Sequence, residues 1–319
     1  MATSDQSTVF DGLDLQLIHA LQLDGRAPFS TIARVLGVSD QTVARRYARL
    51  RSAGRLRVTG RTDPARLGEV WWFVRVRCTP NVARTVGRAL ARRPDTSWVK
   101  LTSGGTEIVA TVRAPTSQDS EALLLEQLPR TPQVLDVSAN CLLHVFFGGR
   151  QSIVEALSPA QVARLGVAPP DPAPGPVTLD EGDRKLLALL DTDGRTGFTA
   201  LAAATGRPVT TLRRRLAELR ASGAVYFDVD YDYRGLRLSS QTLLWLSVAP
   251  DRLLAAGRAL GAHAEVPFAA ATTGSTNLFA SVLCPDPAAL FGYLTTAVAA
   301  LPGVQRTETA PVIQTLKTL

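Results

Sequence analysis

The sequence predicts an α+β fold in which two winged-type helix-turn-helix domains and two ferredoxin-like (βαββαβ) domains form a covalent pseudo-dimer. Two observations predict the duplication: residues 14–58 return at 183–227 without gaps, and residues 87–90 return unchanged as 257–260. Within each copy the apolar spacing changes from helical to strand-like, which predicts two domains per copy. Because solenoid repeats are only roughly 20–50 residues long, this repeat indicates duplication of a whole protein.

Three short helices are expected over 12–58, the pattern of a helix-turn-helix domain. Asp24-Gly25 should end the first helix, because glycine readily adopts positive φ. Ser30 can cap the second helix, and Ser39 stands where the third helix, 40–52, needs an N-cap. That third helix is the one that enters a major groove in such domains.

A strand-rich domain follows, with the order β-α-β-β-α-β of a ferredoxin-like fold. A Gly-rich turn at 103–105 joins the two middle strands as a hairpin. The expected elements are a strand at 70–77, a helix at 81–93, strands at 97–102 and 106–113, a helix at 117–128 and a strand at 134–147.

The second copy repeats this plan after a connector. A proline-rich run at 169–176 predicts a stiff, extended segment, and a short helix is expected before it at 159–165. Helices are then expected within 180–223, a strand at 241–248, a helix at 250–261, a hairpin at 267–283, a helix at 286–300 and a strand at 303–316. We call each helix-turn-helix domain a head and each ferredoxin-like domain a sheet domain. The expected domains are the first head at 1–60, the first sheet domain at 69–147, a linker at 148–178, the second head at 179–229 and the second sheet domain at 238–319.

Composition favours a polyanionic partner. The net charge is +7, and the sequence pI is about 9.8. The three cysteines and three histidines lack metal-ligand spacing, so we expect no metal, no cofactor and no catalytic residues. The start of the chain lacks the pattern of a signal peptide, and no apolar run is long enough for a membrane span. We therefore expect a soluble cytoplasmic protein without a membrane partner.

The first copy contains a run of short motifs before its first strand: Leu13-Asp14, Asp24-Gly25-Arg26, Leu36-Gly37-Val38-Ser39, Thr42-Val43-Ala44-Arg45-Arg46, Leu50-Arg51-Ser52-Ala53-Gly54, Asp63-Pro64 and Leu67-Gly68. In these motifs it resembles the Lrp/AsnC family of bacterial and archaeal regulators. The resemblance implies a transcription factor that binds double-stranded DNA and a small effector, often an amino acid, where its sheet domains pair. It also implies further association, here as a homo-oligomer, a dimer or tetramer of pseudo-dimers. Family members usually carry one copy and dimerise, so the fusion is a departure.

The third helix of each head is expected to contact DNA. Gln41, Thr42 and Arg45 are expected at base edges, because early residues of a recognition helix point into the groove. The full predicted set is Ser39, Gln41, Thr42, Arg45, Arg46, Arg49, Thr210, Thr211, Arg213 and Arg214; phosphate contacts are expected from Arg46, Arg49, Arg51, Arg55 and Arg57. A solvated basic helix face is the alternative, and Arg46 and Arg215 could instead tie the helix to its own domain.

The two heads have diverged in charge. Residues 40–66 carry eight Arg and two Asp, whereas residues 209–235 carry five Arg and four acidic residues. Pro208 also stands where the first head has Ser39. Because attraction to phosphates scales with the positive charges brought to the DNA, the first head should bind more strongly and the operator should be asymmetric.

The effector is expected at the hairpin loops of the sheet domains, as the resemblance implies. Gly-rich loops can turn backbone N–H groups towards a carboxylate, although a plain hairpin turn is an equal alternative. Glu107 stands opposite Asn277, and Lys100 opposite Ala270, which favours the loss or change of one of the two sites. The predicted effector residues are Ser103, Gly104, Gly105, Thr106, Thr273, Gly274, Ser275 and Thr276.

The sequence disfavours three other interpretations. The four tryptophans are expected to pack in sheet cores or interfaces rather than to stack on bases. Siroheme decarboxylases share this two-domain plan, but the sequence shows no basic and histidine cluster for a sheet cavity. A protein-binding antagonist should have lost the arginines of its recognition helices, and both copies keep theirs.

Overall fold

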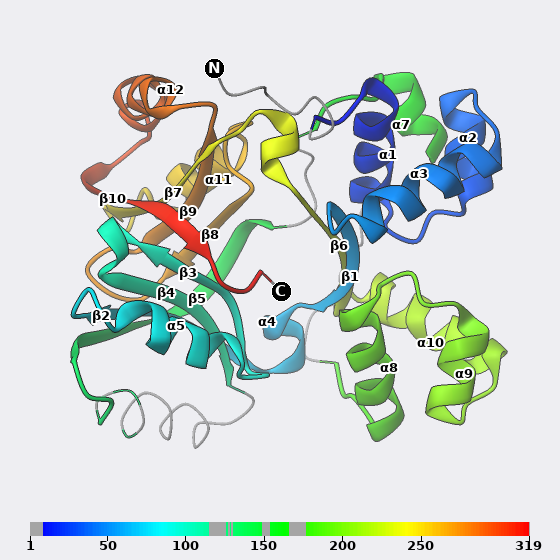
Figure 1. Cartoon of the computed structure of the whole chain (residues 1–319), viewed down its shortest axis with the longest axis horizontal. Helices are drawn as coiled ribbons and strands as arrows, with labels where there is room; N and C mark the ends of the chain where they lie inside the picture. The colour runs from blue at the N-terminus through cyan, green and yellow to red at the C-terminus, as the bar shows by residue number, and fades with distance from the viewer. Residues whose placement is uncertain are drawn as a thin grey trace. The chain divides into compact units, whose positions relative to one another are not determined.

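The structure is a computed structural model that describes residues 9–114, 126, 128, 130–148, 154–165 and 177–318 (Figure 1). The chain divides into two compact units. The head unit comprises Met1–Gly68 and Gly149–Arg237, and the sheet unit comprises Glu69–Gly148 and Leu238–Leu319. Each unit therefore combines matching parts of both copies, and the predicted fold class of two helix-turn-helix and two ferredoxin-like domains is confirmed.

Each head contains the three predicted helices. The helices are α1 Gly12–Leu23, α2 Phe29–Leu36 and α3 Asp40–Ser52 in the first head, and α8 Glu181–Thr192, α9 Phe198–Thr205 and α10 Val209–Ala221 in the second. Ser39 caps α3 as predicted, since its side chain accepts a hydrogen bond from the N–H of Thr42. Ser30 is not a cap: α2 begins after Pro28 and has no side-chain cap.

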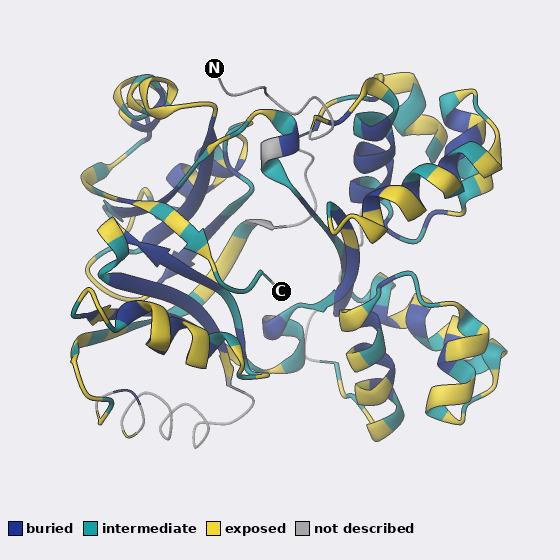
Figure 2. Ribbon diagram, viewed as in Figure 1, coloured by how far each residue is buried: buried dark blue, intermediate teal, exposed yellow. Residues whose placement is uncertain are grey.

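A two-stranded antiparallel sheet joins the heads within the head unit. Strand β1 (Leu56–Thr62) follows the helices of the first head, and β6 (Val225–Tyr231) follows those of the second. They pair along their whole length around Thr59 and Asp228, and they are mostly buried (Figure 2). The strand that follows the helices of each head thus finds its pairing partner in the other head. The sequence did not predict this pairing.

The repeated Asp-Gly-Arg motif forms the contact between the heads. Arg26 donates to the carbonyls of Gly194 (2.6 Å) and Thr196 (3.0 Å). Reciprocally, Arg195 donates to the carbonyls of Gly25 (2.6 Å) and Ala27 (2.9 Å). Burial lowers the pKa of Arg26 to about 10, and the neighbouring charge of Arg195 adds to the shift.

Gly25 is needed for close approach rather than for positive φ, which corrects the sequence prediction. Its φ is not positive, and a Cβ placed on it would lie 2.7 Å from the Cβ of Phe227 in the other head. Two ion pairs flank this contact with the same reciprocity: Arg51 with Asp193 (2.8 Å) and Arg220 with Asp24 (2.9 Å).

A linker segment packs on the first head. Helix α7 (Pro159–Leu165) is where the sequence predicted a short helix, and it contacts α1 and α2. Before it, the Nδ1 atom of buried His19 accepts the N–H groups of Ala156 (3.1 Å) and Leu157 (3.0 Å). The second head has Ala188 at the position of His19, so it lacks this acceptor. The proline-rich run at 169–176 lies outside the described residues.

The sheet unit is a closed barrel of eight strands, four from each copy. Its order is β10-β3-β4-β2-β5-β8-β9-β7. The strands are β2 Val70–Cys78, β3 Thr96–Thr102, β4 Glu107–Ala114 and β5 Val134–Gly148 in the first copy, and β7 Ser240–Val248, β8 Phe268–Thr272, β9 Leu278–Cys284 and β10 Val304–Thr315 in the second.

The long closing strands join the two halves of the barrel. In β5, residues 134–141 pair with β2 of the same copy, and residues 142–148 pair with β8 of the other. In β10, residues 304–311 pair with β7, and residues 312–315 cross to β3. Each sheet therefore has no free edge within the barrel.

Helices cover the outside of the barrel, and side chains fill its inside. The described helices are α5 Ala83–Ala91, α11 Leu253–Gly261 and α12 Pro287–Tyr293, which continues as a π-helical turn over Leu294–Val298. The predicted helix at 117–128 lies largely outside the described residues. An apolar cluster that includes Phe73, Trp245 and Phe279 fills part of the interior. In the described part of the chain, no helix is long and apolar enough to span a membrane.

Replacing Arg26 by Ala should lower the free energy of unfolding by about 2 kcal/mol, because two part-buried carbonyls lose a charged donor. Chemical denaturation followed by far-UV circular dichroism measures the change. Arg184→Ala, an exposed arginine of α8, is the control and should have little effect. Equal stability of Arg26→Ala and the control would contradict a role for the reciprocal arginines.

Acid should release the segment 154–165 from the first head. Burial lowers the pKa of His19 below its ordinary value of 6.5, so the unfolded chain takes up the proton more readily. The stabilising contribution is therefore complete above pH 6.5 and is lost as the pH falls through the lower folded pKa. After correction for the intrinsic exchange rate at each pH, the protection of amides 154–165 in the wild type should fall between about pH 7.5 and about pH 5. His19→Leu should show little protection at either pH. Equal protection of the wild type at the two pH values would refute the role of the ring.

Candidate DNA-binding helices and effector loops

A buried aspartate fixes the recognition helix of the first head. Asp14 is only 2% exposed and shares a capping box at the start of α1 with Asp11. It accepts hydrogen bonds from Arg46 (2.9 Å) and Arg49 (2.6 Å) of α3. The hydrogen bonds that Arg46 donates to Asp11 and Asp14 raise the pKa of its guanidinium. Helix α3 is thereby tied to α1.

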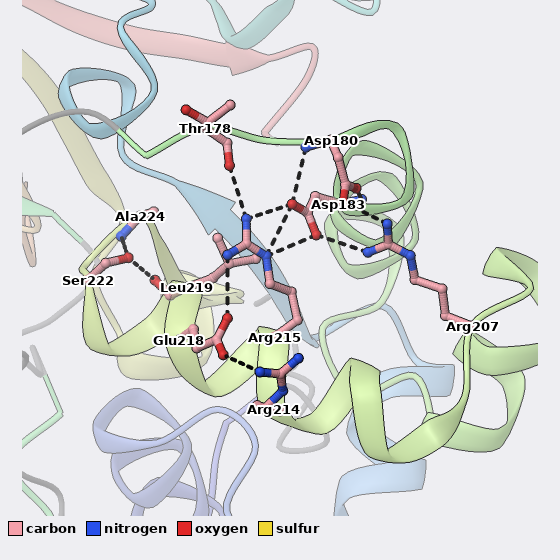
Figure 3. Close-up of polar contacts among 10 residues, drawn as sticks. All are labelled: Thr178, Asp180, Asp183, Arg207, Arg214, Arg215, Glu218, Leu219, Ser222 and Ala224. Atoms are coloured by element: carbon pink, nitrogen blue, oxygen red, sulfur yellow. Dashed lines mark hydrogen bonds and ion pairs between the residues drawn. The ribbon is translucent and has the colours of Figure 1, made fainter.

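The second head has the same aspartate but a different set of arginines. Asp183 is fully buried and accepts from Arg215 (2.7 Å), the counterpart of Arg46 (Figure 3). Arg207, which replaces Val38 in the turn, pairs with Asp183 (3.3 Å) and Asp180 (2.7 Å). The counterpart of Arg49 is Glu218, which pairs with Arg214 (3.6 Å) and Arg215 (3.5 Å).

The predicted base-reading residues of the first head lie at the start of α3. Ser39, Gln41 and Arg45 are exposed, and Thr42 is half-buried behind the cap. Arg45 makes no hydrogen bond or ion pair with any residue in the described ranges, so its guanidinium is available to a partner. Arg46 and Arg49 are instead engaged with Asp14, which favours the alternative that Arg46 holds the helix to its own domain.

The corresponding residues of the second head are less available. Thr210 is exposed and Thr211 half-buried, as Gln41 and Thr42 are. Arg213 lies over the ring of Phe198 at 4.3 Å, and Arg214 is paired with Glu218. Three of the four arginines of α10 are therefore paired with carboxylates: Arg214 and Arg215 within the head, and Arg220 with Asp24 of the first head.

Three further arginines that were expected at phosphates also contact protein groups. Arg51 pairs with Asp193 of the second head, and Arg55 lies 4.4 Å from the ring centroid of Phe10. Arg57 donates to the carbonyls of residues 191 and 192 at 3.2–3.3 Å. These arginines stabilise the head unit, and their contact with phosphates stays a prediction.

The two predicted effector loops differ in structure. In the first copy, Ser103 (φ 53°), Gly104 (φ 74°) and Gly105 (φ 84°) form a short left-handed turn, and Ser103 donates to Glu107 (3.0 Å). At the loop of the second copy, the carbonyl of Thr273 accepts a hydrogen bond from the Nδ2 of Asn140, a residue of β5 in the first copy (2.6 Å). The loop residues Thr106, Gly274, Ser275 and Thr276 complete the two hairpins.

A charged cluster inside the barrel was missed in the sequence. Arg75 lies between Glu107 (2.7 Å) and Glu308 (2.5 Å), and its guanidinium is 4.1 Å from the ring centroid of Trp245. Arg75 and Glu107 come from the first copy, and the other two residues come from the second. Side chains alternate between the two faces of a strand, so Arg75 shares the inner face of β2 with Phe73. This spacing was the sequence signal that could have placed Arg75 inside the barrel.

Lys100 lies in the same interior and is nearly buried. It donates to Gln241 (2.9 Å), which in turn donates to Ser281 (2.9 Å). This chain of polar groups joins β3 of the first copy to β7 and β9 of the second. The barrel interior is therefore polar on one side and apolar on the other.

The tryptophans and histidines occupy structural positions. Trp71 and Trp98 have ring centroids 6.4 Å apart, and Trp98 reaches Phe268 of the other copy at 6.2 Å. His263 is 2.8 Å from the hydroxyl of Tyr293. Among the residues that the structure describes, no group of three or more His, Cys, Asp or Glu side chains could hold a metal ion.

Family models match both halves of the chain. The AsnC-type helix-turn-helix domain matches residues 10–51 and 179–220, and the Lrp/AsnC ligand binding domain matches residues 72–151 and 241–319. The chain belongs to the Lrp/AsnC family. It is thus a tandemly duplicated DNA-binding transcriptional regulator with two domains of the small-molecule-binding type.

Curated relatives correspond to a single copy. An uncharacterized HTH-type transcriptional regulator of Pyrococcus furiosus is 28% identical over 43% of this chain and 94% of its own length. The HTH-type transcriptional regulator FL11 of Pyrococcus horikoshii is 30% identical over 34% of this chain and 74% of its own length. Less than half of this chain therefore spans most of each relative, as a duplication requires.

Solved structures resemble either the whole chain or one copy. The siroheme decarboxylase NirDL aligns with 97% of this chain and 93% of its own, with a TM-score of 0.64 and 14% identity. AsnC of E. coli is 25% identical over 43% of this chain and 94% of its own, with a TM-score of 0.39. The likeness to NirDL shows that this duplicated arrangement of domains recurs, and at this identity it speaks only to the fold.

Arg46→Ala should destabilise the protein by about 2 kcal/mol, because it removes a donor from buried Asp14. Arg45→Ala should change stability by less than about 0.5 kcal/mol, since Arg45 is exposed. Thermal and urea denaturation of both variants measure the difference. A stability loss for Arg45→Ala as large as that for Arg46→Ala would contradict this division of roles between adjacent arginines.

Proposed function

We propose that this regulator reads an asymmetric operator with two unlike heads, of which the first provides most of the affinity. The observation that carries the proposal is the contrast between Arg45 and Arg214. Arg45 is exposed and free of partners among the described residues, whereas Arg214 is paired with Glu218 of its own helix. An unpaired arginine can form a bidentate contact with guanine without first breaking an ion pair.

Charge supports the same asymmetry. The last turns of α3 carry Arg49 and Arg51, whereas those of α10 carry Glu218 and Arg220. A carboxylate at this position repels the phosphate backbone and cancels one nearby cation. The second head should therefore contribute position and spacing more than affinity.

The effector in this proposal is an amino acid that binds in the sheet unit. The ligand-binding domains support a small-molecule effector, and their turns can present backbone N–H groups to a carboxylate. Binding would regulate the heads only if it favours one arrangement of the protein over another. We propose further that the chain acts in the cytoplasm as a dimer or tetramer of pseudo-dimers.

Discrete genomic sites with two unlike half-sites should be recovered when DNA bound to the native protein is sequenced. On such a site, Arg45→Ala should weaken binding by about 1–3 kcal/mol if Arg45 reads a base. Arg214→Ala should weaken binding less, and Arg184→Ala should have little effect. Electrophoretic mobility shifts at several salt concentrations measure these differences.

Equal losses from Arg45→Ala and Arg214→Ala would contradict dominance of the first head. Symmetric half-sites would contradict an asymmetric operator. If no sites are enriched and binding is weak and salt-sensitive, an enzymatic role or a protein-binding role becomes the better explanation, since a siroheme decarboxylase shares this fold.

A further inference from the structure

We infer that the chain closes one of its two effector loops with its own side chain and therefore binds one amino acid, at the loop of the first copy. The inference rests on the proposed function, because it specifies where and in what number that effector binds. It concerns the contrast between the loops at 103–106 and 273–276, which occupy matching positions in the two copies.

The second loop is occupied by strand β5 of the first copy. Besides the bond from Asn140 to the carbonyl of Thr273, the hydroxyl of Thr273 accepts the N–H of Cys141 (2.8 Å), and its N–H donates to the carbonyl of Cys141 (2.9 Å). A Cβ placed on Gly274 would lie 2.0 Å from the Nδ2 of Asn140. The N–H, carbonyl and hydroxyl of Thr273 are thus already bonded to β5, and Asn140 covers the Cα of Gly274.

The first loop cannot be closed in this way. The residues that match Asn140 and Cys141 in the second copy are Ala310 and Pro311. Alanine has no side-chain donor, and proline has no backbone N–H. In keeping with this, a Cβ placed on Gly104 or Gly105 would meet no atom within 4 Å.

The residues beneath the loops also differ, and this difference too favours binding at the first loop. Glu107 lies below the first loop, beside Arg75, so opposite charges stand near its turn. The matching Asn277 is neutral, and both atoms of its amide are bonded to the backbone of Val248 (2.8 Å each). A zwitterionic amino acid carries both charges, so it suits an uncovered glycine turn beside a pair of opposite charges. The second loop has neither the charge pair nor an uncovered glycine.

Calorimetric titration of the full-length protein tests the inference. Each of the proteinogenic L-amino acids is first screened by thermal shift, and every amino acid that stabilises the protein is then titrated. The expected stoichiometry is one amino acid per chain. Hydrogen exchange with the same amino acid should show new protection at 103–106 and no change at 273–276.

A matched pair of variants separates the loops. Gly104→Ala and Gly274→Ala both place a Cβ on a glycine of positive φ, so they impose the same kind of backbone strain. Gly104→Ala should weaken amino-acid binding at least about tenfold, because its Cβ would stand in the open space over the first turn. Gly274→Ala, whose Cβ would meet Asn140, should leave binding unchanged. Asn140→Ala should accelerate exchange at 273–276, whereas Ser138→Ala on the same strand should not.

Two amino acids per chain, or protection at 273–276, would overturn the inference. So would a failure of every amino acid to bind, or a larger effect from Gly274→Ala than from Gly104→Ala. Mobility shifts on the operator are measured alongside without amino acid. Intact operator binding in any of these cases leaves the DNA-reading function standing, so the two failures are distinguishable.

Discussion

Unsatisfied backbone groups at strand edges determine this architecture. A strand edge exposes N–H and C=O groups that must find partners or remain in water. In the head unit, β1 has β6 as its partner, and in the sheet unit the ends of β5 and β10 cover β8 and β3 of the opposite copy. Neither copy alone can satisfy these edges, so the pairing of the copies is a condition of the fold.

The two copies are alike in the contacts that join them and differ at the predicted binding sites. Arg26 and Arg195 make the same pair of bonds, and both depend on a glycine that lets the heads approach closely. In contrast, Glu218 stands at the position of Arg49, and Asn277 stands at the position of Glu107. Symmetry thus persists where it is required for folding, and it has been lost at the predicted binding surfaces.

Much of the fold was predictable, because its signals are local. The cap at Ser39 and the helix at 159–165 lie where the sequence placed them. Long-range contacts were not visible in the same way. Gly25 suggested a turn, but its partner is Phe227, some 200 residues away.

At the candidate site too, local features could be predicted from the sequence, and contacts between distant residues could not. That α3 is basic could be predicted, but the availability of each arginine could not. Arg46 and Arg45 are identical in type and adjacent, and only the position of Asp14, 32 residues earlier, distinguishes them. The inward charge of Arg75 was likewise hidden, because its partner Glu308 lies in the other copy.

The pairing of β1 with β6 has a consequence for gene dosage. A regulator built from separate subunits must first associate, so its active fraction falls steeply when only a few molecules are present. Here the second head is supplied at the effective concentration set by the covalent connection. The two heads of one chain therefore stay paired at any abundance, even where chains associate further, and they are not exchanged with those of a related protein in the same cell.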